Sequence, residues 1–220
     1  MAFSYQCDYF ANRGMVAATV TYRLRTKEDR AALTEGQSTK RVCIPDVKSA
    51  IRWFKQNAQE LGVDPNRIVA GGGSAGGHIS LLGTTNPGLN DPNDPKGFDA
   101  SVAAYVLFNP ALSTSDAKDP DVDFLRHLKA DFGPAIVFFG SKDKWLINGW
   151  APAAAKMKSL GITSVQIQIA EGQTHAFFNK QPWKDITLIA ADRFLTELGY
   201  LQGKPTLSKP KTGEKLSVKP

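Results

Sequence analysis

Apolar residues group along this chain in short runs that alternate with segments of helical spacing. In residues 46–61 the apolar positions fall three or four apart, which predicts an amphipathic helix. Continuous apolar runs bounded by turn residues predict buried strands. The strands predicted in this way span residues 15–22, 67–71, 102–108, 135–140 and 165–169.

Helical segments separate these predicted strands. They span residues 3–10, 46–61, 74–83, 124–129, 151–160 and 186–198, and residues 86–99 are rich in Asn, Pro, Gly and Asp, as in a loop. Strands that alternate with helices predict a mostly parallel sheet covered on both faces, which is a three-layer α/β/α fold. We expect one domain over residues 1–201 and a flexible, Lys- and Pro-rich tail over residues 202–220.

The positive charge of the chain is concentrated in that tail. The formal net charge is +6, and five lysines against one glutamate in residues 203–220 supply +4 of it. A solvated tail therefore explains the charge, and we expect no nucleic-acid partner. No apolar run approaches the roughly 20 residues that a membrane span requires.

The cysteines and the first residues constrain the cellular location only weakly. Cys7 and Cys43 are interpreted as buried thiols, with a single disulfide as the open alternative. Residues 1–6 lack the basic start and the apolar run of a signal peptide. The sequence therefore leaves the location of the protein unknown.

The segment Gly72-Gly73-Ser74-Ala75-Gly76 has the G-x-S-x-G pattern between a predicted strand and a predicted helix. A nucleophilic serine on such a sharp turn needs glycine two residues to either side, because side chains there would collide. The Ala75 amide, at the start of the following helix, is the expected oxyanion donor. The alternatives are an incidental serine in a glycine-rich turn and a phosphate-binding turn, whose usual spacings are missing here.

A serine nucleophile needs a general base, and histidine is suited to neutral pH. His175 follows the last predicted strand, so its side chain can reach back over the sheet to Ser74. His78 lies only four residues after Ser74 on the same predicted helix, and we expect it to pack against a neighbouring loop. We interpret His127 as a surface or core histidine.

Asp143 is the predicted acid that orients His175. It follows the strand of residues 135–140 directly, and functional sites form at the carboxyl ends of parallel strands. A cluster in a polar loop provides rival carboxylates: Asp116, Asp119, Asp121 and Asp123. This cluster is interpreted as a solvated face, because it lacks the glycine spacing of a calcium loop. We expect no metal and no organic cofactor.

Several motifs together resemble the acetyl esterase/lipase group of α/β-hydrolases. They lie in residues 9–16, 20–24, 64–68, 73–78, 139–143 and 175–179. The chain order Ser74, Asp143, His175 is that of this superfamily. The resemblance covers about residues 3–199 and implies an α/β-hydrolase fold. It also implies hydrolysis of short-acyl carboxylic esters, including acetyl groups on sugars, through an acyl-enzyme.

The chain departs from that group at its beginning. Members carry a His-Gly-Gly-Gly loop that completes the oxyanion hole, upstream of the helix that residues 3–10 resemble. We therefore expect this chain to be truncated, without that loop and without the early strands. One of the missing strands would lie between residues 15–22 and 67–71. Three explanations are open: the chain is a fragment, its neighbouring strands pair differently, or a second chain covers the gap. An unpaired sheet edge is also a reason to consider a homodimer.

Three hypotheses about function follow. The first is a serine carboxylesterase that acts on a small-molecule or carbohydrate ester. The second is a hydrolase-fold protein that is impaired or inactive because the oxyanion loop is missing. The third is a serine peptidase of the prolyl oligopeptidase type, which residues 73–77 also resemble. Four aromatic residues are considered as pocket or core residues: Trp145, Trp150, Phe177 and Phe178.

Overall fold

The computed structural model describes residues 3–219 of the chain. Its strands lie side by side in the order of the sequence, β1-β2-β3-β4-β5. β1 to β4 are parallel to one another, and β5 is antiparallel to β4. The strands are β1 (Val69–Gly73), β2 (Ala104–Phe108), β3 (Ala135–Gly140), β4 (Val165–Ala170) and β5 (Leu216–Lys219).

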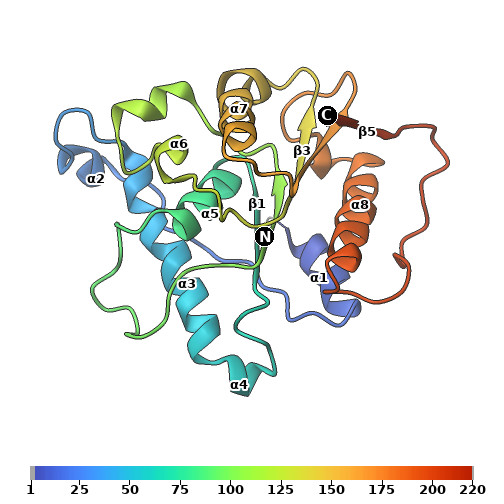
Figure 1. Cartoon of the computed structure of the whole chain (residues 1–220), viewed down its shortest axis with the longest axis horizontal. Coiled ribbons are helices and arrows are strands. Elements are labelled where there is room, and N and C mark those ends of the chain that lie inside the picture. The colour runs from blue at the N-terminus through green and yellow to red at the C-terminus, as the bar shows by residue number, and fades with distance from the viewer. Residues whose placement is uncertain (1–2, 220) are drawn as a thin grey trace.

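Helices cover both faces of the sheet (Figure 1). α3, α5, α6 and α7 pack on one face, and α1 and α8 pack on the other, which confirms the predicted three-layer α/β/α arrangement. The α-helices are α1 (Ser4–Asn12), α2 (Lys27–Ala31), α3 (Ile44–Gln56), α4 (Ala58–Leu61), α5 (Ala75–Thr85), α6 (Phe124–His127), α7 (Ala151–Ser159) and α8 (Trp183–Glu197). None of the helices within residues 3–219 is long and apolar enough to cross a membrane.

The central strands are buried on both faces, as their continuous apolar runs predict. In β3, Val137 and Phe139 point into the core under α5 and α7, whereas Ile136 and Phe138 point into the core under α8. Side chains alternate between the two faces because the repeat of a strand is two residues. Burying each of these large side chains stabilises the fold by about 1.5–3 kcal/mol.

The helix predicted over residues 46–61 is two helices in the structure. α3 begins at Ile44 with Pro45 in its first turn, and it ends at Gln56. Asn57 then leaves the helical conformation, and its side-chain amide donates to the carbonyl of Trp53 at 2.8 Å. Asparagine competes for helix backbone groups in this way. The prediction of helical structure over residues 46–61 is therefore correct, but the prediction of one unbroken helix is wrong.

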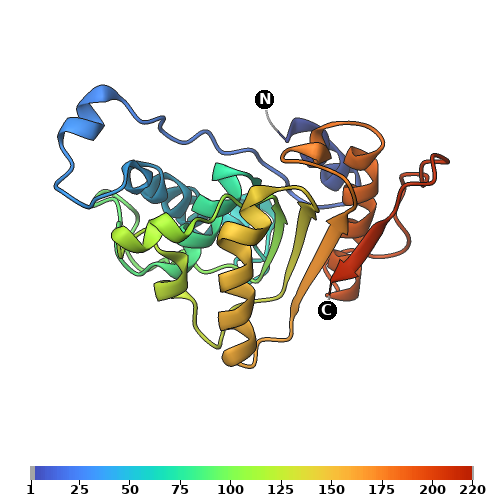
Figure 2. The same ribbon diagram turned by 90° about the horizontal axis from the view of Figure 1, so that it is seen from above.

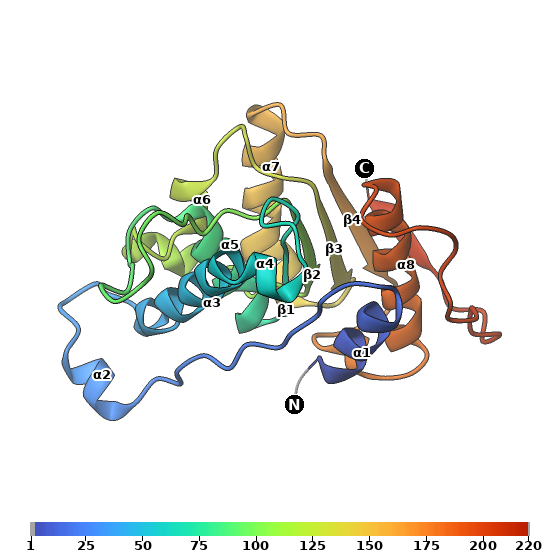
Figure 3. The same cartoon turned by 90° about the horizontal axis from the view of Figure 1, so that it is seen from below.

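Residues 15–22 do not form the predicted strand. The segment is extended, alternates between half-buried and exposed residues, and pairs with no strand of the described sheet. It runs past the outer edge of β1 toward α2 (Figure 3). A strand needs the backbone of a neighbour for its hydrogen bonds. In the described sheet β1 pairs only with β2, so the segment does not join the sheet as a strand.

The C-terminal segment contains a strand that the sequence did not indicate. After α8 the chain loops outward and returns as β5 along the edge of β4 (Figure 2). Leu216 packs against the core under α8, whereas Val218 of the same strand is 67% exposed, so Leu216 anchors the strand. The boundary between a domain and a tail after Leu201 stays a prediction.

α1 is fixed to α8 by a buried carboxylate. Asp192 is fully buried and accepts hydrogen bonds from the Tyr9 hydroxyl at 2.5 Å and from Arg13 Nε at 2.7 Å. We expect Asp192→Leu to lower the free energy of unfolding by about 3–5 kcal/mol, because the largely buried guanidinium loses its counter-ion. Urea unfolding measures this, with Asp8→Ala on the exposed part of α1 as the control. Equal stability of the two variants would contradict the assignment.

Candidate active site

Ser74 lies on a sharp turn between β1 and α5, where the G-x-S-x-G pattern predicts it. Its backbone has φ 53° and ψ −118°, a conformation that a residue with a side chain rarely adopts. Hydrogen bonds fix the turn from both sides. The Ser74 amide donates to the Phe108 carbonyl at 2.9 Å, and the Ser74 carbonyl accepts from Ala111 N at 3.0 Å. The strained turn is therefore tied to the end of β2.

The two flanking glycines differ in their surroundings. A Cβ on Gly72 would lie 2.7 Å from the backbone of Gly76, which a real side chain does not tolerate. A Cβ on Gly76 would meet no atom within 4 Å. The steric expectation is therefore correct for Gly72 and wrong for Gly76. Gly73 is also close-packed, because its Cβ would lie 2.6 Å from the ring of Phe178.

The structure brings Ser74, His175 and Asp143 into one hydrogen-bonded chain. His175 Nε2 lies 2.8 Å from Ser74 Oγ, and His175 Nδ1 lies 2.7 Å from Asp143 Oδ2. Ser74 follows β1, Asp143 follows β3 and His175 follows β4. The carboxyl ends of these parallel strands lie at the same edge of the sheet, which is why residues 101 and 32 positions apart meet.

The hydrogen-bonded chain of side chains leads from the buried carboxylate of Asp143 to the partly exposed imidazole of His175. The Asp143 side chain is 0% exposed and that of His175 is 34% exposed. Asp143 Oδ1 accepts from the Trp145 amide at 3.0 Å, and Oδ2 also accepts from Asn109 Nδ2 at 2.7 Å. A buried carboxylate with three hydrogen-bond donors is fixed in place and can hold an imidazole in one orientation. The arrangement suits proton removal from Ser74 Oγ.

Sequence reasoning missed Asn109. This residue directly follows β2, so the rule that selected Asp143 at the end of β3 applies to it as well. Its position after a strand is the signal in the sequence, whereas its amide is neither an acid nor a base and gives no chemical signal.

Ala75 is the first residue of α5, so its amide belongs to the first turn of the helix. Amides in a first turn have no acceptor inside the helix and lie at its positive end. Ala75 is exposed and directly follows Ser74, as an oxyanion donor must.

The rival histidines are held elsewhere. His78 is 1% exposed, and its Nε2 lies 3.3 Å from the Val122 carbonyl, so it packs against the loop after β2 as expected. His127 Nε2 lies 3.0 Å from the Pro120 carbonyl.

The rival carboxylates are tied into the structure. Lys40 pairs with Asp116, and Arg41 pairs with Asp119 at 2.6 Å and with Asp121 at 2.7 Å. The fourth, Asp123, caps α6 through the Leu125 amide. The contacts of the first three carboxylates anchor the loop after β2 to residues 40 and 41.

His78 makes the stability of the fold dependent on pH. Burial lowers its pKa to about 3, and the nearby charge of Lys40 acts in the same direction. His78 is therefore neutral at pH 7, and its 3.7 Å contact with Asp116 is not an ion pair. Between about pH 6.5 and 3 the unfolded state binds a proton that the folded state does not. The free energy of unfolding therefore falls with decreasing pH, by at most about 1.4 kcal/mol per unit.

We expect His78→Gln to remove this contribution. Urea unfolding at pH 6.5 and at pH 4.5 should show a drop for the natural chain that exceeds the drop for His78→Gln by about 2 kcal/mol. His127→Gln is the matched control, and its drop should equal that of the natural chain. Equal drops in all three proteins would show that His78 is not a buried neutral imidazole.

Three of the four aromatic residues considered for a pocket belong to the core. Trp150, Phe177 and Phe178 are 1–4% exposed, and Trp145 is half-buried. Phe178 stacks on Phe3 at a ring distance of 5.6 Å, which joins the His175 loop to the start of α1.

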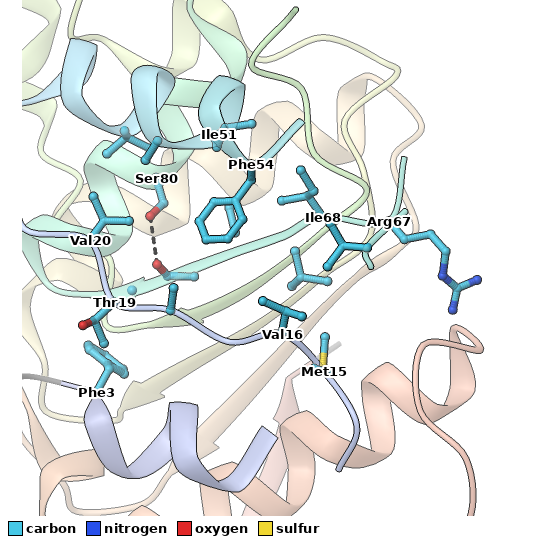
Figure 4. A pocket seen from close by; sticks show the side chains of 18 of the residues that line it. Phe3, Met15, Val16, Thr19, Val20, Ile51, Phe54, Arg67, Ile68 and Ser80 are labelled. Carbon is cyan, nitrogen blue, oxygen red and sulfur yellow. Dashed lines mark hydrogen bonds between the residues drawn. The ribbon is translucent and has the colours of Figure 1, made fainter. Parts of the chain in front are cut away.

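A cavity of about 550 Å³ lies along the outer edge of β1 (Figure 4). Val16 and Val20 of the extended segment lie on one side of it, and Ile51, Phe54 and Ile68 lie on the other. The cavity separates the segment of residues 15–22 from β1, where the sequence predicts a gap between two strands. None of the three candidate residues of the hydrogen-bonded chain is among the described residues that line it. The cavity does reach the turn that carries Ser74, because Gly72, Gly73 and Gly76 are among the residues that line it.

Comparisons with known proteins agree on one family. The BD-FAE family model matches residues 1–111. The chain is 33% identical to the probable carboxylic ester hydrolase LipM of Mycobacterium tuberculosis over 129 residues, which cover 46% of the chain and 30% of LipM. It is 26% identical to esterase LipQ of the same organism, over 73% of the chain and 44% of LipQ. The chain thus spans less than half the length of these curated relatives.

Solved structures extend the similarity over most of the fold. Esterase 2 of Thermogutta terrifontis, in a structure with propionate bound, superimposes with a TM-score of 0.79 at 34% identity. The match covers 92% of this chain and 79% of that esterase. The family match includes the turn at Ser74. The chain therefore belongs to the BD-FAE family, within the carboxylesterases of the α/β-hydrolase fold.

Proposed function

We propose that this protein is a serine hydrolase that cleaves short-acyl carboxylic esters. The observation that carries the proposal is the continuous hydrogen-bonded chain from Ser74 Oγ through His175 to the buried carboxylate of Asp143. A hydroxyl that is 2.8 Å from an imidazole nitrogen can lose its proton as it attacks a carbonyl.

The proposed reaction has two halves. Ser74 Oγ forms a bond to the ester carbonyl carbon as its proton passes to His175 Nε2. The tetrahedral intermediate then expels the alkoxide, which takes that proton and leaves as an alcohol. Water attacks the acyl-enzyme in the same way, and the carboxylic acid and the free Ser74 hydroxyl are the products. Asp143 stabilises the imidazolium that forms in each half.

The Ala75 amide is the proposed donor to the negatively charged oxygen of the tetrahedral intermediate. The positive end of α5 acts on the same oxygen, because Ser74 immediately precedes this helix. Losing one donor of this kind costs roughly 100- to 1000-fold in rate. The rate of the chain therefore indicates whether a further donor assists Ala75.

A short acyl group is the proposed specificity. Structures of the similar Thermogutta terrifontis esterase were obtained with propionate and with butyrate bound, and this supports small acyl groups here. The resemblance to acetyl esterases adds acetylated carbohydrates as candidate substrates.

Chain-length dependence tests this proposal. We expect kcat/KM for p-nitrophenyl acetate and butyrate to exceed that for the octanoate, and acetate to be released from acetylated xylan. A prolyl p-nitroanilide tests the peptidase alternative and should not be cleaved. A preference for the anilide would overturn the ester assignment, and a lack of any turnover would leave a hydrolase fold without activity.

A further inference from the structure

Asn109 occupies the centre of the candidate site without belonging to the proposed triad. It follows β2, which lies between the strands that lead to Ser74 and Asp143. Its backbone amide donates to the Phe138 carbonyl at 2.8 Å, and its side chain is 0% exposed. Asn109 is thus fixed to the same strand, β3, that Asp143 follows.

The conformation of Asn109 does not favour stability by itself. Its φ is 46°, in the left-handed region that is unfavourable for a residue with a side chain, although asparagine tolerates it best. Its buried Oδ1 has no hydrogen-bond partner among the described residues. Both features cost free energy. The contact that offsets them is the 2.7 Å hydrogen bond from Nδ2 to Asp143 Oδ2.

The oxygen that receives this bond is the one that binds the imidazole. Asp143 Oδ2 accepts from Asn109 Nδ2 and from His175 Nδ1, and Oδ1 accepts from the Trp145 amide. The Asn109 amide, at the end of β2, donates to one carboxylate oxygen, and the Trp145 amide donates to the other. Together these two donors define the plane of the carboxylate. The amide orientation follows from the partner, because Oδ1 of Asn109 and the carboxylate oxygen are both acceptors and only Nδ2 can donate to it.

We propose that Asn109 is a positioning residue that holds the Asp143 carboxylate so that Oδ2 faces His175 Nδ1. The role rests on the proposed hydrolysis, and Asn109 acts through Asp143 rather than on the substrate. Without its amide, the carboxylate keeps one protein donor besides His175 and can rotate. The imidazole then loses its fixed orientation toward Ser74 Oγ, and a small misplacement of a reacting group lowers rates strongly.

Two variants and two measurements test this role. Asn109→Leu removes the amide at similar volume, and Asn109→Gly removes it while accepting the left-handed backbone without strain. We expect kcat for p-nitrophenyl acetate to fall on the order of 10- to 100-fold in both, with KM within about threefold of the natural chain. In proton NMR, the low-field signal of the His175 Nδ1 proton, identified by its loss in His175→Gln, should broaden or move upfield.

A buried asparagine outside the site provides the control. Asn86 is 3% exposed, and its Nδ2 donates to the Asp121 carbonyl at 2.6 Å. Asn86→Leu should lower stability but leave kcat per folded molecule and the His175 signal unchanged. An unchanged His175 signal in both Asn109 variants would overturn the positioning role. The NMR comparison needs no turnover, so an inactive natural chain would refute the proposed hydrolysis and still decide the role of Asn109.

Discussion

Replacing Ser74 by alanine is expected to lower kcat for p-nitrophenyl butyrate by on the order of 10³- to 10⁶-fold. The substitution removes the only atom that forms a bond to the substrate in the proposed route. The acyl-enzyme can then no longer form, while the residues that surround the ester stay in place. We therefore expect KM and the free energy of unfolding to change little. Steady-state kinetics together with urea unfolding measures both effects.

Ser80→Ala is the matched control for that experiment. Ser80 lies on the same helix, α5, and its hydroxyl donates to the Gly71 and Gly76 carbonyls rather than to an imidazole. Its loss should leave kcat within about threefold of the natural chain, because this buried hydroxyl contacts two backbone carbonyls and none of the reacting groups. Comparable activity of Ser74→Ala and the natural chain would refute Ser74 as the nucleophile.

Replacing Gly72 by alanine is the second change with a large expected effect. The new Cβ would lie 2.7 Å from the Gly76 backbone, so the start of α5 must move away from β1. Ser74 lies between these two residues, and its Oγ would shift relative to His175 Nε2. We expect a loss of kcat on the order of 100-fold and destabilisation by about 1–3 kcal/mol.

Gly76→Ala tests whether that effect is steric. The added methyl group meets no atom within 4 Å, and alanine favours a helix over glycine by about 1 kcal/mol. We expect this variant to be as stable as the natural chain or more stable, and to retain its kcat within a few fold. Equal losses in the Gly72 and Gly76 variants would show that the turn is not shaped by the contact described here.

Much of the site could be predicted because the fold was predictable. Apolar runs separated by helical segments indicate parallel strands, and parallel strands place their carboxyl ends at one edge. Ser74, Asp143 and His175 each follow such a strand, so the order of strands and helices along the sequence is enough to predict that they lie close together. Asn109 follows the remaining parallel strand, β2. Its residue type indicates neither an acid nor a base, so only its position after a strand points to the site.

The remaining differences concern contacts that one segment's own sequence does not reveal. Residues 15–22 have the composition of a strand, but strand formation depends on a neighbouring backbone, and a cavity lies between this segment and β1 in the described structure. β5 is the reverse case, because a polar segment became a strand through the free edge of β4. The break at Asn57 depends on one side-chain hydrogen bond within a periodic pattern.

Covalent labelling tests the central claim most directly. Paraoxon phosphorylates the similar Thermogutta terrifontis esterase, as the structure of that adduct records, and it reacts with an activated serine rather than with an ordinary one. The protein is incubated with paraoxon, digested and analysed by tandem mass spectrometry, with His175→Ala in parallel. We predict one phosphorylated residue, Ser74, in the natural chain and a strongly slowed reaction in the variant. No adduct on Ser74, or an adduct that forms equally fast without His175, would contradict a Ser74 nucleophile activated by His175.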